Sequence, residues 1–420
     1  MNAGQSMHPS TQVLILAGGE GERLPPLTMF RPKPMLPFRG LFRLIDFTLF
    51  NCLNSGLTDV GVLTQHRHEE LAAYIRKDWY DLWSRSGGAE PIRCLPPASG
   101  KRYRGTADAV FQNLPVISPK KPEHVLVLSG DHVYNMDYRE LLRRHLETDA
   151  DVTISTIDYP LQDVGRFGVV EVDKDLKVTE FVEKPSTPEL LPQRPGPVLV
   201  NIGVYVFKMQ ALAESLVENC DYGLGYDFGQ HVIPSLIGSA RVYAYDFRDK
   251  ARNAAYYWRD VGTIDSYHEA SMDVVRPNSS FYQYDREQPH HPARDTWTEP
   301  SVSGNALVSE TVVSSGVRIE DDAEIERSVL MPGAQVAKGV RIRGAIIEEG
   351  VQIPAGFTVG WNLEQDRKCH TVSPGGVVVV NCTPPSERPV SLSVWRKRTA
   401  ASEASRSRGK RSASRTGTFG

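Results

Sequence analysis

A six-residue spacing of aliphatic side chains in the last third of the chain constrains the fold more than any other feature of the sequence. The anchors fall in short series whose members are six residues apart: Val317, Ala323 and Val329; Ile319 and Ile325; Val336 and Ile342; Val340 and Ile346; and Ile347, Ile353 and Val359. The phase slips near residues 331–333 and again near 348–350, and glycines and small residues fill the gaps. A period of about six residues is typical of a β-helix, in which each repeat places one aliphatic side chain in a stacked core. A set of β-hairpins is the alternative, but it gives no reason for this spacing.

Short apolar runs alternate with amphipathic stretches through the part of the chain that precedes the repeats. The runs that predict strands lie at residues 13–17, 60–63, 125–128, 152–155 and 204–207. Residues 69–79 and 139–147 carry apolar side chains at helical spacing instead. Strands that alternate with helices favour an α/β domain with a largely parallel sheet.

Changes in composition predict the domain boundaries. Residues 1–12 are a polar N-terminal extension, and residues 13–276 form the α/β domain. Residues 277–300, rich in Pro, His, Arg and Gln, form a linker to the repeats, which occupy residues 301–382. Residues 383–420 lose the core pattern, and so few large apolar side chains predict a disordered, basic tail.

Charge, cysteine content and hydropathy exclude several function classes. The formal net charge is −3, and because residues 396–420 carry +7, the rest of the chain carries −10, so no basic nucleic-acid-binding surface extends over the molecule. The five cysteines lie far apart without a CxxC pair, which disfavours a disulfide framework or a metal cluster and suits a reducing compartment. No stretch approaches the roughly 20 apolar residues that span a bilayer, and the N-terminus lacks the apolar core of a signal peptide. We therefore expect a cytoplasmic protein with no nucleic-acid or membrane partner.

A glycine-rich loop follows the first predicted strand directly. Its glycines, which let backbone amides approach phosphate oxygens closely, are Gly18, Gly19 and Gly21. The loop is neither a Walker A motif nor a good dinucleotide fingerprint, because Leu24 stands where the third glycine of the fingerprint belongs. A tight strand-to-helix turn is therefore an alternative. However, Arg23 lies in the loop and Lys33 lies between two prolines, and a glycine loop with cations in fixed directions predicts a polyphosphate site.

Two acids and a second lysine lie near other predicted strand ends. Asp131 follows the strand at 125–128, at the edge where open α/β sheets bind ligands, and a carboxylate there can ligate Mg²⁺. A helix N-cap is the alternative for this residue. Asp260 is a candidate to complete the metal site. Lys184, which precedes a proline, is either a directed ammonium group or an exposed lysine of an edge strand.

Taken together, these segments resemble the ADP-glucose pyrophosphorylases (glucose-1-phosphate adenylyltransferases) of bacteria and plants, a branch of the sugar-1-phosphate nucleotidylyltransferases. The similarity runs in order from about residue 13 to 359 and comprises LAGGEGERL at 16–24, RLIDF at 43–47, NCLNSG at 51–56, YRGTADAVFQNL at 103–114, GDHVY at 130–134, FGVVEVD at 167–173, FVEKP at 181–185, YDFGQHVIP at 226–234 and YWRDVGT at 257–263. The resemblance implies a Rossmann-like nucleotidyltransferase domain with a mixed, mostly parallel sheet, followed by a left-handed parallel β-helix.

The resemblance also implies a reaction. ATP and α-D-glucose 1-phosphate would give ADP-glucose, a precursor of glycogen, and pyrophosphate, with Mg²⁺ as cofactor. A phosphate oxygen of the sugar phosphate would attack the α-phosphorus of ATP in line, so that catalysis is positioning plus charge neutralisation. A homotetramer and an anionic allosteric effector are further expectations from the family.

Residue roles follow from the same resemblance. Arg23 matches the loop arginine that grips the leaving phosphates, and Lys33 matches the lysine that stabilises charge at the α-phosphate. Asp131 and Asp260 match the carboxylates that hold the metal. The positions that hold glucose 1-phosphate are matched by Tyr103, Gly168, Glu183, Lys184 and Asn201. Of these, Lys184 would pair with the phosphate and Glu183 with sugar hydroxyls.

Two departures from the family pattern affect substrate recognition. Asn201 begins an Asn-Ile-Gly triplet where the family usually has Ser-Met-Gly, but an amide can still hydrogen-bond a hydroxyl group. The loop at 95–100 is short and lacks the glutamines that the family places beside adenine, and Arg102 replaces a tryptophan. A related pyrophosphorylase that uses UTP, dTTP or GTP is therefore an alternative. A non-catalytic regulatory paralogue is another, although the presence of Arg23, Lys33 and Asp131 argues against it.

A third departure concerns regulation. Phe30 and Pro37 stand where members activated by fructose 1,6-bisphosphate carry a lysine and a histidine, whereas Arg43 of that effector site is retained. We expect weak or absent activation by fructose 1,6-bisphosphate, with Arg43 free to serve another anionic effector.

Overall fold

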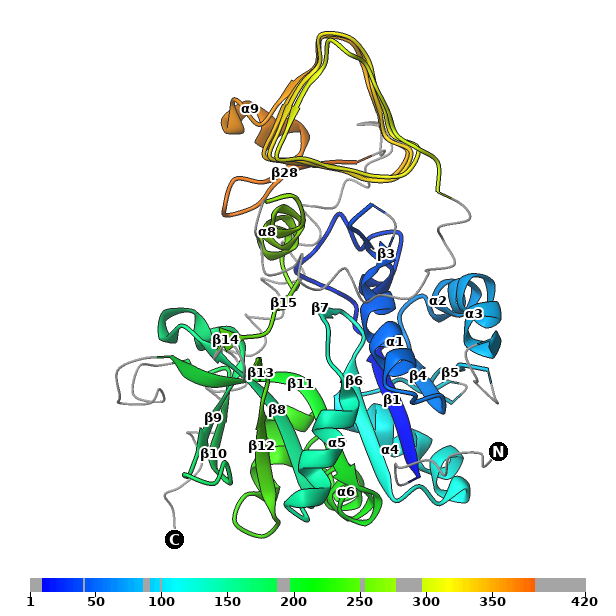
Figure 1. Cartoon of the computed structure of the whole chain (residues 1–420), viewed down its shortest axis with the longest axis vertical. Helices are drawn as coiled ribbons and strands as arrows, with labels where there is room; N and C mark the ends of the chain where they lie inside the picture. Colours follow the sequence, from blue (N-terminus) through cyan, green and yellow to red (C-terminus); the bar gives the residue numbers. More distant parts are fainter. Residues whose placement is uncertain are drawn as a thin grey trace, which may run out of the picture.

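The β-helix stands as a triangular prism beside one end of the α/β domain, as Figure 1 shows. The computed structural model describes residues 10–40, 42–85, 91–98, 100–186, 197–249, 254–276 and 297–381. Most of the predicted N-terminal extension, the predicted linker up to residue 296 and the predicted tail lie outside the described residues.

A nine-stranded sheet forms the centre of the α/β domain. Its strands are β1 (Thr11–Ala17), β4 (Val60–Thr64), β5 (Arg93–Leu95), β6 (His124–Ser129), β8 (Val152–Tyr159), β9 (Gly168–Val172), β10 (Val178–Glu183), β11 (Val198–Lys208) and β12 (Val242–Asp246). They lie in the order β10-β9-β11-β6-β1-β4-β5, while β8 also pairs with β11 and β12 pairs with β8. Seven strands run in one direction and only β10 and β11 run against them, so the predicted mostly parallel sheet is confirmed.

Helices cover both faces of this sheet because its central strands are apolar on both sides. Along β1, Val13 and Ile15 face one core cluster while Leu14 faces the other, as the two-residue period of a strand requires. The first cluster packs against α1 (Leu44–Asn54), α2 (His68–Tyr74), α3 (Tyr80–Arg85) and α5 (Tyr138–Glu147). The second packs against α4 (Thr106–Ile117), α6 (Met209–Leu216) and α7 (Ile233–Leu236). Within the described ranges, no helix is both long enough and apolar enough to cross a lipid bilayer.

Short elements connect this framework. Short 3-10 helices are η1 (Lys33–Met35), η3 (Ser118–Lys120) and η4 (Leu161–Arg166). Short π-helices are η2 (Ile75–Trp79), η6 (Val217–Asp221) and η7 (Phe228–Val232). Two-stranded pairs are formed by β2 (Pro37–Phe38) with β3 (Phe42–Arg43), β7 (His132–Tyr134) with β15 (Trp258–Asp260), and β13 (Arg248–Asp249) with β14 (Ala254–Ala255).

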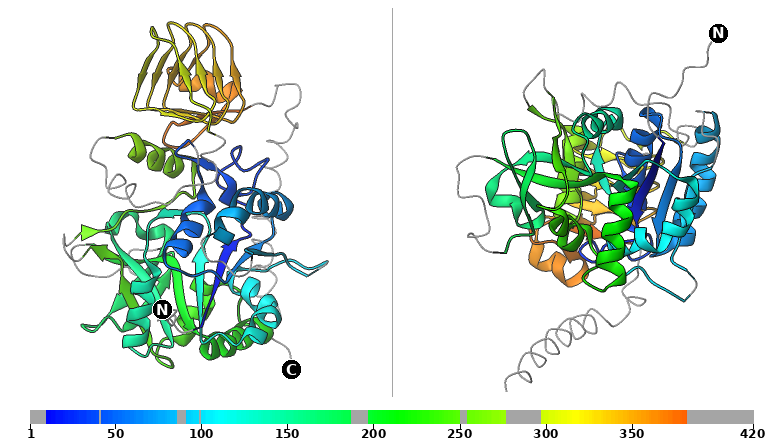
Figure 2. Two further views of the ribbon diagram at one scale, coloured as in Figure 1. Left: turned by 45° about the vertical axis from the view of Figure 1, so that its right-hand side comes forward. Right: turned by 90° about the horizontal axis from the view of Figure 1, so that it is seen from below.

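The repeat domain is a parallel β-helix with three flat faces. One face holds β16 (Ser301–Val302), β19 (Arg318–Ile319), β22 (Gln335–Val336) and β25 (Gln352–Ile353), and the second holds β17 (Leu307–Ser309), β20 (Glu324–Glu326), β23 (Arg341–Arg343) and β26 (Thr358–Val359). The third holds β18 (Val312–Val313), β21 (Val329–Leu330), β24 (Ala345–Ile347), β28 (Val378–Val380) and β27 (Thr371–Val372). Figure 2 shows the coils stacked side by side. The β-helix that the spacing predicts, rather than a set of hairpins, is therefore confirmed.

The coils of the β-helix advance by 17 residues rather than by three full hexapeptides, except for the coil from Ala345 to Val378, which contains an insertion and spans 33 residues. Ser301 pairs with Arg318 and Arg318 with Gln335, and the same offset recurs on the other faces. The missing residue explains the two phase slips in the sequence. They fall at one corner of the triangle, where Gly316, Gly333 and Gly350 stack on each other with positive φ angles. A side chain at this corner would be strained, because the backbone there is left-handed.

The third face of the β-helix packs on the α/β domain. Val329, Met331 and Ile346 share one apolar cluster with α8 (Ile264–Val275) and with the segment around the β2–β3 pair. The insertion that carries α9 (Leu363–Cys369) contributes to the same contact, because Gly375 donates its backbone N–H to Asp265 of α8 at 3.2 Å. The repeat domain is therefore docked against the segment that carries Lys33 and Arg43.

Candidate active site

The glycine loop and Asp131 come together because β1 and β6 are parallel neighbours. Leu16 of β1 lies opposite Ser129 of β6, so the residues after both strands emerge at the same edge of the sheet. A cavity of about 340 Å³ opens there, lined by Gly19, Gly21, Arg23, Lys33, Asp131 and their neighbours. Gly18 packs against Gln65 beside β4 instead. The geometry suits a polyphosphate, as the sequence predicts, while Gly18 lies outside the cavity lining and contacts Gln65.

Asp260 is brought beside Asp131 and Lys33 by the pairing of β7 with β15. Its register places Asp260 opposite His132, the residue after Asp131. The ammonium group of Lys33 lies between the two acids, 2.7 Å from Oδ2 of Asp131 and 3.5 Å from Oδ1 of Asp260. The ring of His132 lies at hydrogen-bonding distance, 3.2 Å, from the carbonyl oxygen of Ile202 through Nδ1. Lys33 is thus within ion-pair distance of both carboxylates.

The electrostatics of this cluster keep Lys33, Asp131 and Asp260 charged. Burial by itself opposes ionisation of Asp260, but Lys33, His132, Arg166 and Arg23 outweigh it and lower the pKa of that carboxyl to about 2. At Asp131, burial likewise opposes ionisation and Lys33 favours it, and the pKa of this carboxyl is also lowered. Burial disfavours the ammonium form of Lys33, yet the two acids raise its pKa above the ordinary value.

Mg²⁺ prefers oxygen ligands and usually binds only one or two protein carboxylates, because water and phosphate oxygens supply the rest of its coordination. Asp131 and Asp260 provide two such carboxylates. Among the residues that the structure describes, no group of three or more His, Cys, Asp or Glu side chains could hold a metal by itself. Asp131 and Asp260 therefore fit an ion that also binds a substrate phosphate, and do not form a closed structural site.

A second cavity of about 270 Å³ adjoins the first and shares Arg23, Lys33 and Asp131 with it. It contains the predicted sugar-binding residues Gly168, Glu183, Lys184 and Asn201. Lys184, in a left-handed backbone conformation, lies 3.1 Å from Glu183 through its ammonium group. The structure thus brings these residues together at one side of Lys33, opposite the glycine loop.

Glu183 is held between two glycines. A Cβ atom on Gly168 would lie 2.7 Å from Oε2 of Glu183, and one on Gly229 would lie at the same distance from that oxygen. Such separations are too short for real contacts, so a side chain at Gly229 would displace the carboxylate, and one at Gly168 would also clash with the ring of Phe181. Gly229 follows Asp227, whose side chain accepts hydrogen bonds from the backbone of Gly229 and Gln230 and so fixes the turn.

The side chain of Asn201 lines the cavity and also hydrogen-bonds within β11. Its Oδ1 accepts a hydrogen bond from the backbone of Gly203 at 2.9 Å, and its Nδ2 donates to the hydroxyl of Tyr205 at 2.8 Å. These bonds stabilise an irregularity in β11, where the register against β8 shifts between Asn201 and Tyr205. One N–H and part of the oxygen are left to contact a sugar.

Tyr103 is not brought to either cavity. Its hydroxyl group donates to the carbonyl oxygen of Leu95 at 2.9 Å and accepts from Asn113 at 2.8 Å. Its backbone N–H donates to Gln65, which also packs against Gly18. Tyr103 therefore ties the loop before α4 to the glycine loop, and its hydroxyl is already occupied.

The residues at the second cavity that the sequence did not predict include Arg166, His132 and Gly229. His132 carries an available signal, since it adjoins Asp131 at a strand end. Gly229 lies within the matched block at 226–234 but has no chemistry of its own. Arg166 precedes the matched block at 167–173, and nothing in the sequence places it beside Asp260.

Arg43 lies apart from these cavities, in a third cavity of about 430 Å³ between the two domains. Its guanidinium donates to the carbonyl oxygen of Met35 at 2.9 Å and lies 3.2 Å from Glu349 of the β-helix. Arg31 lies 2.9 Å from the same carboxylate. The position suits a site that links the domains, and both arginines are already paired with Glu349.

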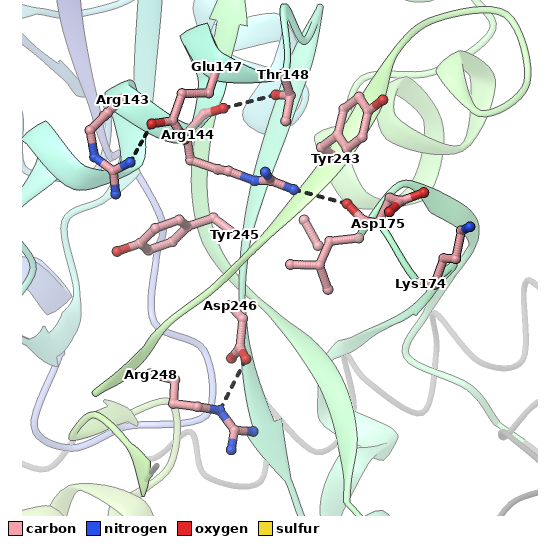
Figure 3. Close-up of a pocket in the computed structure, with 12 residues that line it drawn as sticks. Arg143, Arg144, Glu147, Thr148, Lys174, Asp175, Tyr243, Tyr245, Asp246 and Arg248 are labelled. Atoms are coloured by element: carbon pink, nitrogen blue, oxygen red, sulfur yellow. Dashed lines mark hydrogen bonds and ion pairs between the residues drawn. The ribbon is translucent and has the colours of Figure 1, made fainter. Parts of the chain in front are cut away.

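A further cavity of about 560 Å³ lies on α5, β12 and the turn between β9 and β10 (Figure 3). Its charged side chains are largely paired with one another, for example Arg248 with Asp246 at 3.1 Å. It contains none of the sequence-predicted residues and shares no residue with the cavities around Lys33.

Comparisons with known proteins agree with this arrangement. Residues 12–276 match the family model described as nucleotidyl transferase, and residues 283–380 match the model described as GlmU-like, C-terminal hexapeptide. The chain is 40% identical to glucose-1-phosphate adenylyltransferase 2 of Alkalilimnicola ehrlichii, over 88% of this chain and 93% of the relative. It is 39% identical to the glucose-1-phosphate adenylyltransferase of Methylococcus capsulatus, over 90% of this chain and 96% of the relative. The chain is therefore a nucleotidyltransferase that belongs to the glucose-1-phosphate adenylyltransferase family.

Proposed function

We propose that the protein transfers the adenylyl group of ATP to α-D-glucose 1-phosphate, forming ADP-glucose for glycogen synthesis and releasing pyrophosphate. The observation that carries the proposal is the junction of the two cavities, where Lys33 lies between Asp131 and Asp260. One cavity has the glycine loop and cations of a polyphosphate site, and the other has the acids and amide of a sugar site. The names of the relatives supply the substrate pair.

The chemistry at the junction needs no general base from the protein. An oxygen of the sugar phosphate is already anionic and attacks the α-phosphorus of ATP, while the bond to the β-phosphate oxygen breaks on the opposite side. Lys33 neutralises the charge that develops on the α-phosphate, and Arg23 stabilises the leaving pyrophosphate. Because Lys33 is buried and aimed by two acids, its charge is in place before the reaction begins.

Mg²⁺ belongs to the same proposal. Asp131 and Asp260 would hold the ion, which supplies charge neutralisation for the phosphate oxygens. Lys33 would then exchange part of its contact with the acids for a contact with the α-phosphate.

An assay of pyrophosphate release tests the function. The protein is supplied with glucose 1-phosphate and, in turn, ATP, UTP, dTTP or GTP, each with Mg²⁺ or with excess chelator. We expect release with ATP and Mg²⁺ only. Faster pyrophosphate release with another nucleotide would show that the protein is a nucleotidylyltransferase with a different nucleotide specificity. No release with any nucleotide would favour a non-catalytic paralogue.

We also propose a cytoplasmic homotetramer with an anionic effector at the cavity beside Arg43. The two arginines there share one carboxylate of the β-helix, so an effector has to compete with Glu349 for them. Phe30 adds no charge to the site and Pro37 adds neither charge nor N–H, so fructose 1,6-bisphosphate should activate weakly or not at all. Light scattering of the purified chain tests the assembly, and activity measured with and without the bisphosphate tests the effector; activation of severalfold would contradict the expectation.

A further inference from the structure

Arg166 lies at the sugar-side cavity, at the end of η4 and close to the start of β9. Its guanidinium donates to Oδ2 of Asp260 at 3.0 Å, and its carbon Cζ lies 5.3 Å from the ring centre of Phe167. A guanidinium has five N–H groups in a rigid fork, and the side chain is 39% exposed. Donors are therefore left over for a ligand in the cavity.

The backbone places Arg166 beside Lys184. The N–H of Lys184 donates to the carbonyl oxygen of Phe167 at 2.9 Å, which joins the segment after Arg166 to the segment that carries the lysine. Both cations line the sugar-side cavity, and neither lines the cavity of the glycine loop. Arg166 and Lys184 therefore lie at the cavity for the sugar phosphate and not at the cavity for the polyphosphate of the nucleotide.

Asp260 brings the guanidinium to the point where the reaction occurs. This acid lines the sugar-side cavity, and its other oxygen, Oδ1, is 3.5 Å from Lys33, which lines both cavities. The attacking phosphate has to reach the same junction, because Lys33 marks the place of the α-phosphate. A guanidinium binds carboxylate and phosphate oxygens with the same fork of donors, so it can hold Asp260 with one edge and a phosphate with the rest.

We propose that Arg166 binds the phosphate of glucose 1-phosphate at this junction, with Lys184 on the other side of that phosphate. The inference rests on the proposed function and goes beyond it by assigning a residue that the family blocks do not include. Lys184 is 54% exposed and paired with Glu183, so Arg166 is the less exposed of the two cations. It supplies the inner contact and aligns the attacking oxygen.

Titration calorimetry of the full chain with glucose 1-phosphate, in excess chelator, tests the inference without catalysis. Arg166→Gln should raise the Kd about ten- to a hundredfold, the effect of one charge-assisted contact, and Arg166→Lys should fall between it and the wild type. In the pyrophosphate assay, Arg166→Gln should raise the KM for glucose 1-phosphate similarly and leave the KM for ATP within about twofold. Arg139→Gln, which breaks an arginine–aspartate pair on α5 at 2.6 Å, is the matched control and should change neither constant.

An unchanged Kd for glucose 1-phosphate in Arg166→Gln would overturn the inference, because a residue that only neutralises Asp260 would leave metal-free binding intact. An equal rise of the KM for ATP would overturn it too, by placing Arg166 on the nucleotide. Both results leave the proposed function standing as long as the wild type forms ADP-glucose. If the wild type neither binds nor uses glucose 1-phosphate, the function and the inference fail together.

Discussion

The buried carboxyl group of Glu348 should give the protein an unusual dependence of stability on pH. It lies at the interface between the domains, is only 4% exposed, and is 3.7 Å from Arg31. Burial, with a smaller contribution from the charge of Glu349, raises its pKa to about 7 in spite of Arg31. The ordinary value for this group is 4.5. The folded protein therefore binds a proton more tightly at this carboxyl than the unfolded chain does.

The free energy of unfolding should therefore decrease as the pH rises from about 4.5 to about 7, and then level off. At about 1.4 kcal/mol per pKa unit, the change amounts to about 3 kcal/mol. Glu348→Gln keeps the shape of the protonated acid and removes its charge. At pH 5 the variant should be within about 1 kcal/mol of the wild type, and at pH 8 it should be more stable by up to about 3 kcal/mol, seen as a Tm that is several degrees higher.

Thermal unfolding of both proteins at pH 5, 7 and 8 is the measurement. Glu349→Gln is the control, because Glu349 lies 2.9 Å from Arg31 and 3.2 Å from Arg43 and its loss should destabilise the interface. If Glu348→Gln were less stable than the wild type at pH 8, the ion pair with Arg31 would outweigh the cost of burial, and the reasoning would be refuted.

The remaining predictions concern the active site. Asp131→Asn should lower kcat about 10²- to 10³-fold with the fold intact by circular dichroism, because a charge aimed at the reacting phosphates is lost; near-normal turnover would exclude the role. Lys33→Ala should lower kcat, whereas Lys184→Gln should mainly raise the KM for glucose 1-phosphate, whose charge is present before the reaction; similar kinetics for both would show that the roles are divided wrongly. Gly229→Ala should raise the same KM about tenfold by pushing away the sugar-side carboxylate, and Gly165→Ala, whose new Cβ would lie 3.6 Å from its nearest neighbour, should not; equal effects would point to general damage.

The sequence alone determined the elements whose signal is local. Six-residue spacing predicts the β-helix because each repeat contributes its own side chain to the core. The glycine loop and Asp131 are predicted to meet because each follows a strand of the same parallel sheet, and the structure places them at one edge. The matched blocks add the family, which the comparisons confirm.

Contacts between segments far apart in the chain depend on the tertiary fold. The pairing of β7 with β15 brings Asp260 to Asp131, and the short helix η4 before β9 brings Arg166 to Asp260. Tyr103, which sequence similarity matches to a glucose 1-phosphate position, lines neither cavity, and its hydroxyl is hydrogen-bonded to Leu95 and Asn113. Side-chain periodicity reports which face of an element is buried, but it does not report which distant element covers that face or which partner uses a polar group first. Those outcomes depend on the register and packing of the whole fold.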